Sequence, residues 1–507
     1  MPSVNITKVY LLNVPLENDY KNTLYFTSKA DQQTYFASRI VKSYTDFSYQ
    51  RKDHIIRIPE EYDEIYNVNY VMYQNSAYSN KWFYAFITEL KYVNDGMTEA
   101  RIETDVIQTW LFDYDVKASF VEREHVDNDT IGLHTVPENV ETGDYIVYDQ
   151  VSDTQNTELG IIVSSTVDTS EMTDWYGAKY NGVPSGERYY YFGINDIANL
   201  KLSLQTLMDN GKIDAVSSLF LAPTWLTPHV SHIITESSTP TAYNINVSRI
   251  AQLDGYTPRN NKLLTFPYCY VMVNNGQNQS IELRQEVWSN TSSGMVLAVY
   301  GALAPGCSIR AIPLNYNGQQ VGHAYGINLG KFPQINWATD PYTNWLTENG
   351  LNMAIQGAEG LMQTGSSIAQ KDVGGVVSGL SGIASALHTN FLAQRIPPQT
   401  VGNGNAGDVI TSLGANKYHI LKMGVRQEYA KIIDGYFDMF GYRVNMVKIP
   451  NKAHRSRWWY TKTIDVNIDG PIPQDDMQRI KNAYNEGITF WRNASEIQNY
   501  SLSNAIV

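Results

Sequence analysis

The chain has 507 residues, with 38 lysines and arginines against 51 aspartates and glutamates, and only two cysteines. One hydrophobic core stops growing near about 250–300 residues, so this length predicts several domains. The net charge of −13 argues against tight binding of nucleic acid, which needs clustered cations. Two cysteines make no disulfide framework, and residues 1–18 lack a signal-peptide pattern, so we expect synthesis in a reducing cytoplasm.

Residues 1–118 predict mixed and mostly β structure. The chain contains 36 tyrosines, and tyrosine favours pleated, half-buried surfaces. Ser28 to Asp31 resemble a capping box, which predicts a short helix that runs to about Ile40.

The clearest local signal lies between Trp82 and Val106. Bulky residues alternate with other side chains from 82 to 92 and again from 100 to 106. Asp95-Gly96 stands between the two runs, and this dipeptide favours a turn with positive φ at both positions. The pattern therefore predicts a β-hairpin closed by a type I′ turn.

Residues 119–340 contain many short apolar runs separated by Asn, Gly and Pro. This spacing is typical of barrels or sandwiches and not of alternating strands and helices. The best predicted strands are Leu159–Val167, Lys262–Val273, Ser280–Trp288 and Met295–Tyr300.

Residues 341–412 differ in kind, because the segment from Val373 to Gln394 has no formal charge and is rich in Gly and Ala. About 20 uncharged residues can cross a bilayer as a helix, and Gly375 and Gly379 have a spacing that lets helices approach closely. Interspersed serines make the segment too polar for a permanent anchor. Two interpretations stay open: a buried or disordered glycine-rich loop, and a loop that is shielded at first and enters a membrane after release.

The residues that we expect to carry the membrane activity of such a loop are Leu351, Ile355, Leu361, Ile368, Val373, Gly375, Val376, Val377, Gly379, Leu380, Ile383, Leu387, Phe391 and Leu392.

Residues 413–507 return to mixed structure. Apolar residues recur every three or four positions from Val425 to Phe440, which predicts an amphipathic helix that ends at Gly441. A strand is expected at Tyr442–Ile449. A second helix around Met477–Tyr484 is expected to end at Gly487.

Motifs with chemical meaning are weak throughout the chain. Gly402, Gly404 and Gly407 spell GxGxxG, but Pro397-Pro398 precedes them and no strand–helix unit surrounds them, so we interpret them as a linker. His229 and His232 lack further ligands for zinc. We therefore expect no catalytic residue, no metal and no cofactor, although paired carboxylates leave a glycan-degrading enzyme open.

Lys452, Arg455 and Arg457 precede Trp458-Trp459-Tyr460. Such a basic and aromatic cluster fits contact with phosphate, or a strand edge or subunit contact in which Arg packs on aromatic rings. We favour the strand edge or subunit contact over phosphate.

Several blocks near both chain ends carry a specific resemblance. They are NVPLENDYKN at 13–22, YVMYQN at 70–75, NKWFYAF at 80–86, ETDVIQTW at 103–110, FVEREH at 120–125, PPQT at 397–400, GYRVN at 441–445 and GITFW at 487–491. In these blocks the chain resembles the tail-knob, or distal tail-tube, proteins of small phi29-like short-tailed phages.

The resemblance implies a mainly β protein with a few short helices, whose tail-tube-like β-barrel domain is built from both chain ends. The expected divisions are 1–118 and 413–507 for the tube domain, 119–340 for a β-rich middle, and 341–412 for an inserted hydrophobic loop and linker. Within that loop, residues 345–400 occupy the position of the family's lumen plug.

The resemblance also implies a structural, non-enzymatic virion protein. A homohexamer would conduct phage DNA during ejection, and its loop would plug the lumen and then insert into or perforate the host membrane. The implied partners are other tail proteins, the DNA in the lumen and, transiently, the host membrane. A β-rich tail enzyme that degrades glycans and a receptor-binding tail protein are the alternatives.

Overall fold

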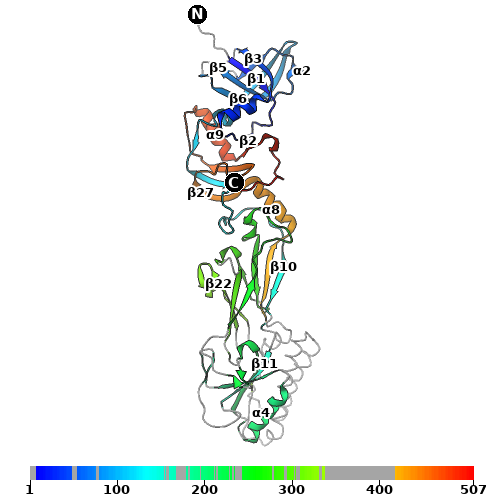
Figure 1. Ribbon diagram of the computed structural model, residues 1–507, viewed down its shortest axis with the longest axis vertical. Helices are drawn as coiled ribbons and strands as arrows, with labels where there is room; N and C mark the ends of the chain where they lie inside the picture. The colour runs from blue at the N-terminus through cyan, green and yellow to red at the C-terminus, as the bar shows by residue number, and fades with distance from the viewer. Residues whose placement is uncertain are drawn as a thin grey trace, which may run out of the picture. The chain divides into compact units, whose positions relative to one another are not determined.

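The chain is mainly β, as predicted, with a few short helices between the strands (Figure 1). The computed structural model describes residues 7–47, 54–75, 79–153, 155, 159–166, 178–180, 183–185, 187–193, 196–210, 212, 215–227, 229–230, 233–234, 242–276, 279–289, 294–301, 303, 309–329, 334–336 and 417–507.

Two compact units divide the chain. Unit 1 combines Met1–Thr142 with Pro258–Leu263 and Glu428–Val507, and unit 2 is formed from Gly143–Thr257 and Leu264–Gln427. We expected the tube domain to use residues 1–118 and 413–507. Unit 1 instead continues to Thr142, includes the short segment Pro258–Leu263, and resumes only at Glu428.

Unit 1 contains a six-stranded antiparallel sheet in the order β3-β1-β5-β6-β7-β4. Its strands are β1 (Thr7–Leu12), β3 (Ile40–Phe47), β4 (Ile55–Ile58), β5 (Tyr70–Asn75), β6 (Trp82–Asn94) and β7 (Met97–Thr104).

The predicted hairpin is confirmed, since β6 and β7 pair with Asn94 opposite Met97. The predicted turn type is wrong, because neither Asp95 nor Gly96 has a positive φ. A register shift between Tyr92 and Asn94 bends the end of β6. Asn94 then accepts a hydrogen bond from the Gly96 backbone N–H at 3.1 Å, so an Asx turn closes the hairpin.

A second sheet of unit 1 joins the two ends of the chain, in the order β2-β30-β28-β9-β27. Its strands are β2 (Asn22–Leu24), β9 (Ser119–Glu124), β27 (Tyr442–Lys448), β28 (Trp458–Ile464) and β30 (Ile488–Trp491). β2 runs parallel to β30, with Leu24 opposite Trp491. The short strands β8 (Asp115–Val116) and β29 (Ile468–Asp469) form a separate pair.

One hydrophobic core contains side chains from both ends of the chain, including Phe36 and Tyr70 from the first part and Trp458 and Trp491 from the last. Figure 1 accordingly shows blue and red segments side by side in unit 1. The indole N–H of Trp110 donates to Asp476 at 3.0 Å, across 366 positions of sequence. The core of unit 1 is therefore built from both ends of the chain.

The helices of unit 1 are α1 (Lys29–Ala37), α2 (Tyr62–Ile65), α3 (Val106–Trp110), α8 (Gln427–Phe440) and α9 (Gln474–Glu486), and α8 begins one residue before the unit boundary. The Ser28 side chain caps α1 as predicted, but the helix ends before Ile40, where β3 begins. The predicted ends of α8 and α9 are confirmed. Gly441 and Gly487, which follow them, have φ of +64° and +104°.

Among its described residues, unit 2 contains three larger antiparallel sheets and one two-stranded sheet. The first comprises β10 (Tyr145–Ser152), β26 (His419–Val425), β19 (Cys269–Asn274) and β20 (Ser280–Leu283). The second comprises β18 (Ala242–Val247), β21 (Met295–Gly301), β22 (Ile309–Tyr316), β23 (Gln319–Val321) and β24 (Ile327–Leu329). The third comprises β16 (His229–Val230), β17 (Ile233–Ile234), β14 (Arg188–Gly193), β11 (Leu159–Ser165), β15 (Val216–Pro223) and β25 (Gln334–Asn336).

The remaining elements of unit 2 are β12 (Ala178–Tyr180), β13 (Val183–Ser185) and the helix α4 (Ile197–Asp209). Short 3-10 turns complete the chain at Thr224–Leu226, Asn261–Leu264, Gln285–Val287, His323–Tyr325 and Ala494–Glu496.

Several expectations for the middle of the chain need correction. β26 pairs with β10 on one side and β19 on the other, so residues 419–425 belong to unit 2. The predicted strand from Lys262 to Val273 begins only at Cys269, because a 3-10 turn and a cis peptide bond before Pro267 interrupt it. The helix α4 was not predicted at all.

Candidate functional site

The predicted basic cluster lies at the start of β28, where the C-terminal tail returns along it. Arg455 is buried, and its guanidinium donates to the backbone carbonyl of Asn504 at 3.3 Å. Arg457 forms an ion pair with Glu496 and donates to the carbonyl of Ser503 at 3.1 Å. Both guanidinium groups thus bind groups of the same chain.

Lys452, the third predicted cation, is exposed. The aromatic rings beside the cluster face inward: Trp458 is fully buried and packs against Trp491, with ring centroids 4.8 Å apart. Tyr500 closes over both rings at 5.4 and 5.1 Å. The basic and aromatic residues therefore fix the end of the chain to β28 and β30.

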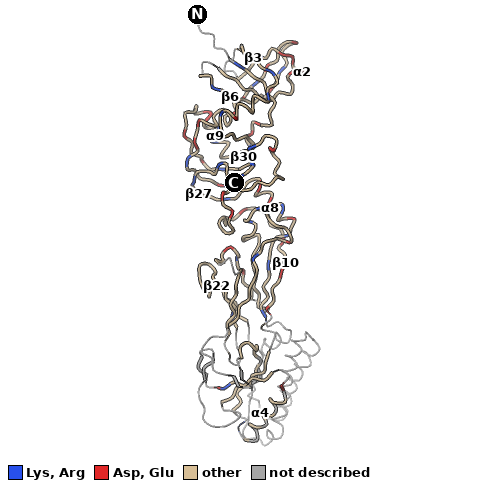
Figure 2. Tube along the Cα trace, in the orientation of Figure 1, with Lys and Arg blue, Asp and Glu red and all other residues tan. Residues whose placement is uncertain are grey.

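A second polar cluster in unit 1 was not predicted from the sequence. Asp434 and Asp438 lie one helical turn apart on α8 and face the segment Pro258–Leu263, while Asp129 and Glu138 approach the same segment from the N-terminal part. We call these four carboxyl groups the acidic socket. Figure 2 shows acidic and basic residues close together near α8.

The socket binds the segment mainly through its backbone and one asparagine. Asp434 accepts hydrogen bonds from the backbone N–H of Arg259 at 2.8 Å and of Asn260 at 3.1 Å. The Asn260 side chain donates to Asp434 and to Asp438, both at 2.8 Å. Asp129 accepts from the Asn261 backbone N–H at 2.9 Å. These hydrogen bonds hold the backbone N–H groups of Arg259, Asn260 and Asn261 in fixed positions.

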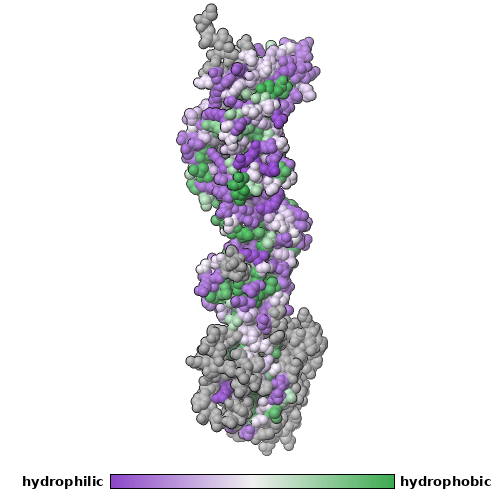
Figure 3. All heavy atoms as spheres, in the orientation of Figure 1, coloured by the Kyte–Doolittle hydropathy of each residue, from purple (hydrophilic) through white to green (hydrophobic). Residues whose placement is uncertain are grey.

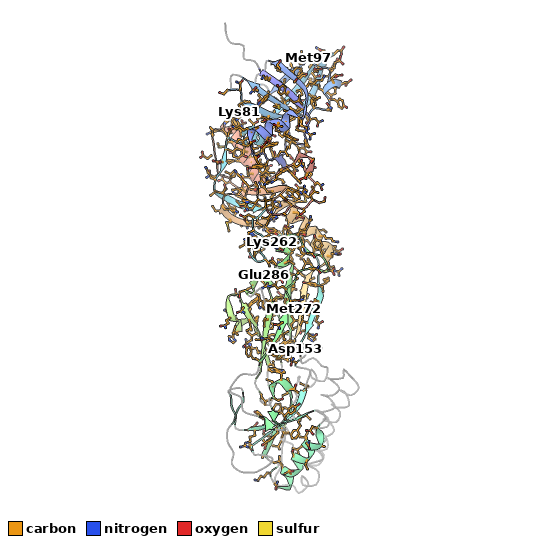
Figure 4. The ribbon with its side chains drawn as sticks, viewed as in Figure 1. Lys81, Met97, Asp153, Lys262, Met272 and Glu286 are labelled. Carbon is orange, nitrogen blue, oxygen red and sulfur yellow. The ribbon has the colours of Figure 1, made fainter. Side chains whose placement is uncertain are left out.

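Glu138 neutralises two buried cations at the other end of the segment. Lys262, labelled in Figure 4, places its ammonium 2.5 Å from the Glu138 carboxylate, and Arg123 of β9 pairs with the other oxygen. The side chain of Glu138 has no exposed area. Arg123 also donates to the carbonyl of Gly441 at 2.7 Å. A buried charge of this kind is tolerable only when it is paired and hydrogen-bonded.

His125 connects the socket helix to β28 in its neutral form. Burial and the positive charge of Arg455 lower the pKa of His125 to about 3. The backbone N–H of Tyr460 donates to Nδ1 at 2.7 Å, so the proton of the neutral ring lies on Nε2, which donates to the Asp438 carbonyl at 3.0 Å. Burial has the opposite effect on the Asp438 carboxyl and raises its pKa to about 6.

Gly441 allows the close approach of α8 to β9. A Cβ at this position would lie 2.1 Å from the carbonyl oxygen of Glu124, and the positive φ is itself unfavourable for other residues. The motif GYRVN therefore contains a glycine that the packing requires, as well as Tyr442, which donates to Asp129 at 2.7 Å.

The other candidate motifs have structural partners or lie outside the described residues. Glu60 accepts from Tyr44 at 2.9 Å, and Asp475 lies in the first turn of α9. His229 begins β16, whereas His232, the GxGxxG run at 402–407 and all predicted plug residues from Leu351 to Leu392 lie outside the described residues.

In the part of the chain that the structure describes, no helix combines the length and the hydropathy that a bilayer crossing needs. In the same residues, no three His, Cys, Asp or Glu side chains are grouped as ligands for a metal ion.

Comparison with known proteins gives a consistent result. Residues 235–505 match the family model for Bacillus phage phi29 tail knob protein gp9, C-terminal domain. Residues 5–115 match the model of the caudoviral major tail protein N-terminus.

Whole proteins match over almost their full length. Tail knob protein gp9 of Bacillus phage B103 is 25% identical, with 97% of each chain covered, and that of Bacillus phage phi29 is 25% identical, with 98% of each covered. The structure of the bacteriophage C1 tail knob protein gp12 is similar with a TM-score of 0.68 at 15% identity, covering 99% of this chain and 100% of that chain.

Proposed function

The chain belongs to the phi29 gp9 tail knob family, and from this premise we propose that several copies close a tube at the distal end of a short phage tail. The protein is a structural component of the virion tail. In the proposed tube, six copies surround a lumen through which phage DNA leaves, as the resemblance to the phi29-like proteins implies.

The observation that supports this proposal is the composition of unit 1. The region that matches the major tail protein model, residues 5–115, shares one hydrophobic core with β28, α9 and β30 from the end of the chain. In the family, both chain ends are expected to build the tube domain. A domain that needs both ends, with the remaining residues inserted between them, suits a tube wall that carries an appended knob.

The acidic composition suits a conduit better than a DNA-binding site. The net charge of −13 offers no excess of cations to hold phosphate groups. A wall that repels phosphate weakly allows DNA to slide without specific contacts. Two of the three basic residues that the sequence singled out, Arg455 and Arg457, already bind groups of their own chain.

We further propose that residues 345–400 plug the lumen before infection and enter the host membrane afterwards. Burying their apolar side chains stabilises either location by roughly 0.8 kcal/mol per CH₂ group, and water is the unfavourable environment. A modest force from DNA behind the plug then selects between the two locations.

Imaging of the purified full-length chain by electron microscopy tests the tube. We expect rings with a central bore, and particles without a bore would contradict the proposal. Dye release from liposomes tests the loop separately. The full-length chain is expected to release dye, and a variant that lacks residues 351–394 is expected to release much less. Equal leakage from both proteins would remove the membrane role and leave the conduit.

A further inference from the structure

The second sheet of unit 1 carries a row of exposed apolar side chains across three neighbouring strands. Val447 of β27 lies opposite Phe120 of β9, and Phe120 lies opposite Ile464 of β28. Directly opposed residues of an antiparallel pair project on the same face of a sheet. The three side chains are 69%, 37% and 55% exposed, so they form one contiguous apolar row on the protein surface.

One more apolar residue extends this row along the edge of the sheet. Ile449, two positions after Val447, follows β27 and is 58% exposed. We call these four residues the apolar row: Phe120, Val447, Ile449 and Ile464. Figure 3 shows hydrophobic surface over the part of unit 1 where Figure 1 places β27.

The area of the apolar row matches the centre of a stable interface. At these exposed fractions, four large side chains present roughly 400 Å² of apolar surface, which is as large as the largest apolar patch of a typical soluble monomer. A stable interface buries about 800 Å² on each partner, of which about 60% is apolar. The row therefore supplies most of the apolar area that one side of such an interface needs.

The charges beside the row are already paired within the chain. Lys448, next to Val447, lies 2.6 Å from Glu124, and Lys462 lies 3.0 Å from Glu122. These contacts leave little local charge to repel an apolar partner or to attract a strongly charged one such as nucleic acid.

The row also lies at an open sheet edge. Within the described residues, β27 is the last strand of its sheet and pairs only with β9. Asn445 has a φ of +45°, and a register shift separates Arg443 from Met446, so the bulge disturbs only the first half of the strand. The regular second half, Met446–Lys448, presents unpaired backbone groups beside the apolar side chains.

We infer that the apolar row packs against unit 1 of a second copy of this chain. The inference rests on the proposed function and names the surface through which the ring closes. A closed ring uses two different faces of each subunit, so the row of one copy meets another face of the next. An apolar centre of this size, with neutralised charges around it, is typical of contacts between permanent subunits.

Single charged substitutions test this inference on the full-length protein. Val447→Asp and Ile464→Asp place a carboxylate in the row, and we expect each to weaken assembly at least tenfold, measured as mass by light scattering over a concentration series. Ile432→Asp is the matched control, because Ile432 lies on α8, outside the row, and is 67% exposed. The control is expected to assemble like the wild-type chain.

Thermal unfolding of each variant separates lost assembly from lost folding. Val447→Thr keeps the β-branched shape and is expected to weaken assembly less than Val447→Asp. This variant keeps the inference testable if the introduced charge unfolds the sheet. Rings from Val447→Asp and Ile464→Asp with the wild-type mass and affinity would overturn the inference and leave the proposed tube intact. A wild-type chain that forms no ring at any concentration would remove the tube as well.

Discussion

Two regions of unit 1 join segments that lie far apart in the sequence, and they use different chemistry. Where the chain ends meet, β2 pairs with β30, and Trp458, Trp491 and Tyr500 form an aromatic cluster behind them. In the acidic socket, carboxylates bind the backbone of Pro258–Leu263. The first region depends on shape and burial. The second depends on hydrogen bonds that are lost when a carboxylate is protonated or removed.

The difference shows how each contact becomes specific. An aromatic cluster excludes water and tolerates small shifts, because burial is not directional. A carboxylate that accepts backbone hydrogen bonds tolerates little displacement, since a buried donor without a partner is costly. We therefore expect the aromatic region to contribute more to stability than the socket, which fixes the position of one short segment.

The largest effect is expected where the chain ends meet. Trp491 is fully buried, and its indole donates to Asn22 at 2.9 Å. Trp491→Ala should lower the free energy of unfolding by about 3–5 kcal/mol, because it leaves a cavity and removes one of the two hydrogen bonds that the Asn22 side-chain oxygen accepts. Chemical denaturation measures this loss. Trp491→Phe keeps a ring and is expected to lose less than half as much, and equal losses would show that the hydrogen bond matters more than burial.

The socket should respond less strongly to loss of its main acceptor. Asp434→Ala leaves the backbone donors of Arg259 and Asn260 without an acceptor, and we expect a loss of about 2–3 kcal/mol. Limited proteolysis should cut the chain faster near residues 258–263 in this variant. Asp475→Ala, at the start of α9, is the control and is expected to leave the cleavage rate unchanged. Wild-type stability of Asp434→Ala would show that Asp434 does not anchor the segment.

A change of pH separates the two regions. Burial raises the pKa of Asp438 to about 6, above the ordinary value near 4, so its charged form disfavours the folded state. That penalty is fully present above pH 6 and disappears as the pH falls towards 4. When the pH falls from 7 to 4, the free energy of unfolding of the wild type should therefore rise by about 2 kcal/mol relative to that of Asp438→Asn.

Denaturation curves of the two proteins at both pH values measure this difference. The comparison must be made between variants, because His125, with a pKa lowered to about 3, acts in the opposite direction over the same range. A pH-independent difference between wild type and Asp438→Asn would show that the carboxyl does not titrate there. Trp491→Phe should show no such dependence relative to wild type.

The smallest effect is expected at the half-exposed edge of the aromatic cluster. The Arg457 side chain is 36% exposed and pairs with Glu496. Arg457→Ala should cost about 0.5–1 kcal/mol, since ion pairs in contact with water contribute little. Arg457→Lys should recover part of this loss, and thermal unfolding in high and low salt measures both. A loss of more than about 3 kcal/mol in the free energy of unfolding would show that Arg457 contributes as much as a buried residue and would contradict this prediction.

Local patterns predicted the elements whose ends depend on a single residue. Ser28 starts α1 through its own side chain, and Gly441 and Gly487 end α8 and α9 because few other residues adopt positive φ. The hairpin was predicted from its alternation, but its turn was not, because the bulge before Asn94 depends on pairing with β7. Recognition of the family depended on blocks such as GYRVN and GITFW, which follow one another in the family's order along the chain.

The acidic socket was missed because its residues are ordinary in the sequence. Asp434 and Asp438 interrupt an otherwise apolar helix face at a spacing of four, and this is the one local signal that they face inward. Asn260 and Lys262 lie more than 170 positions earlier, and Lys262 was interpreted as the start of a strand. Distant pairings of this kind, like the membership of β26 in unit 2, are not encoded by any local period.

The parallel pairing of β2 with β30 also constrains when the protein can fold. Leu24 and Ile488 bound the two strands, so 488 − 24 = 464 positions separate them. At a synthesis rate of about 5–20 residues per second, β2 waits roughly 20–90 seconds on the ribosome before its neighbour exists. The intervening unit 2 has time to form first, whereas unit 1 is completed only when almost the whole chain has been translated. Truncated products would therefore lack a finished unit 1 and, with it, the domain that we propose forms the tube wall.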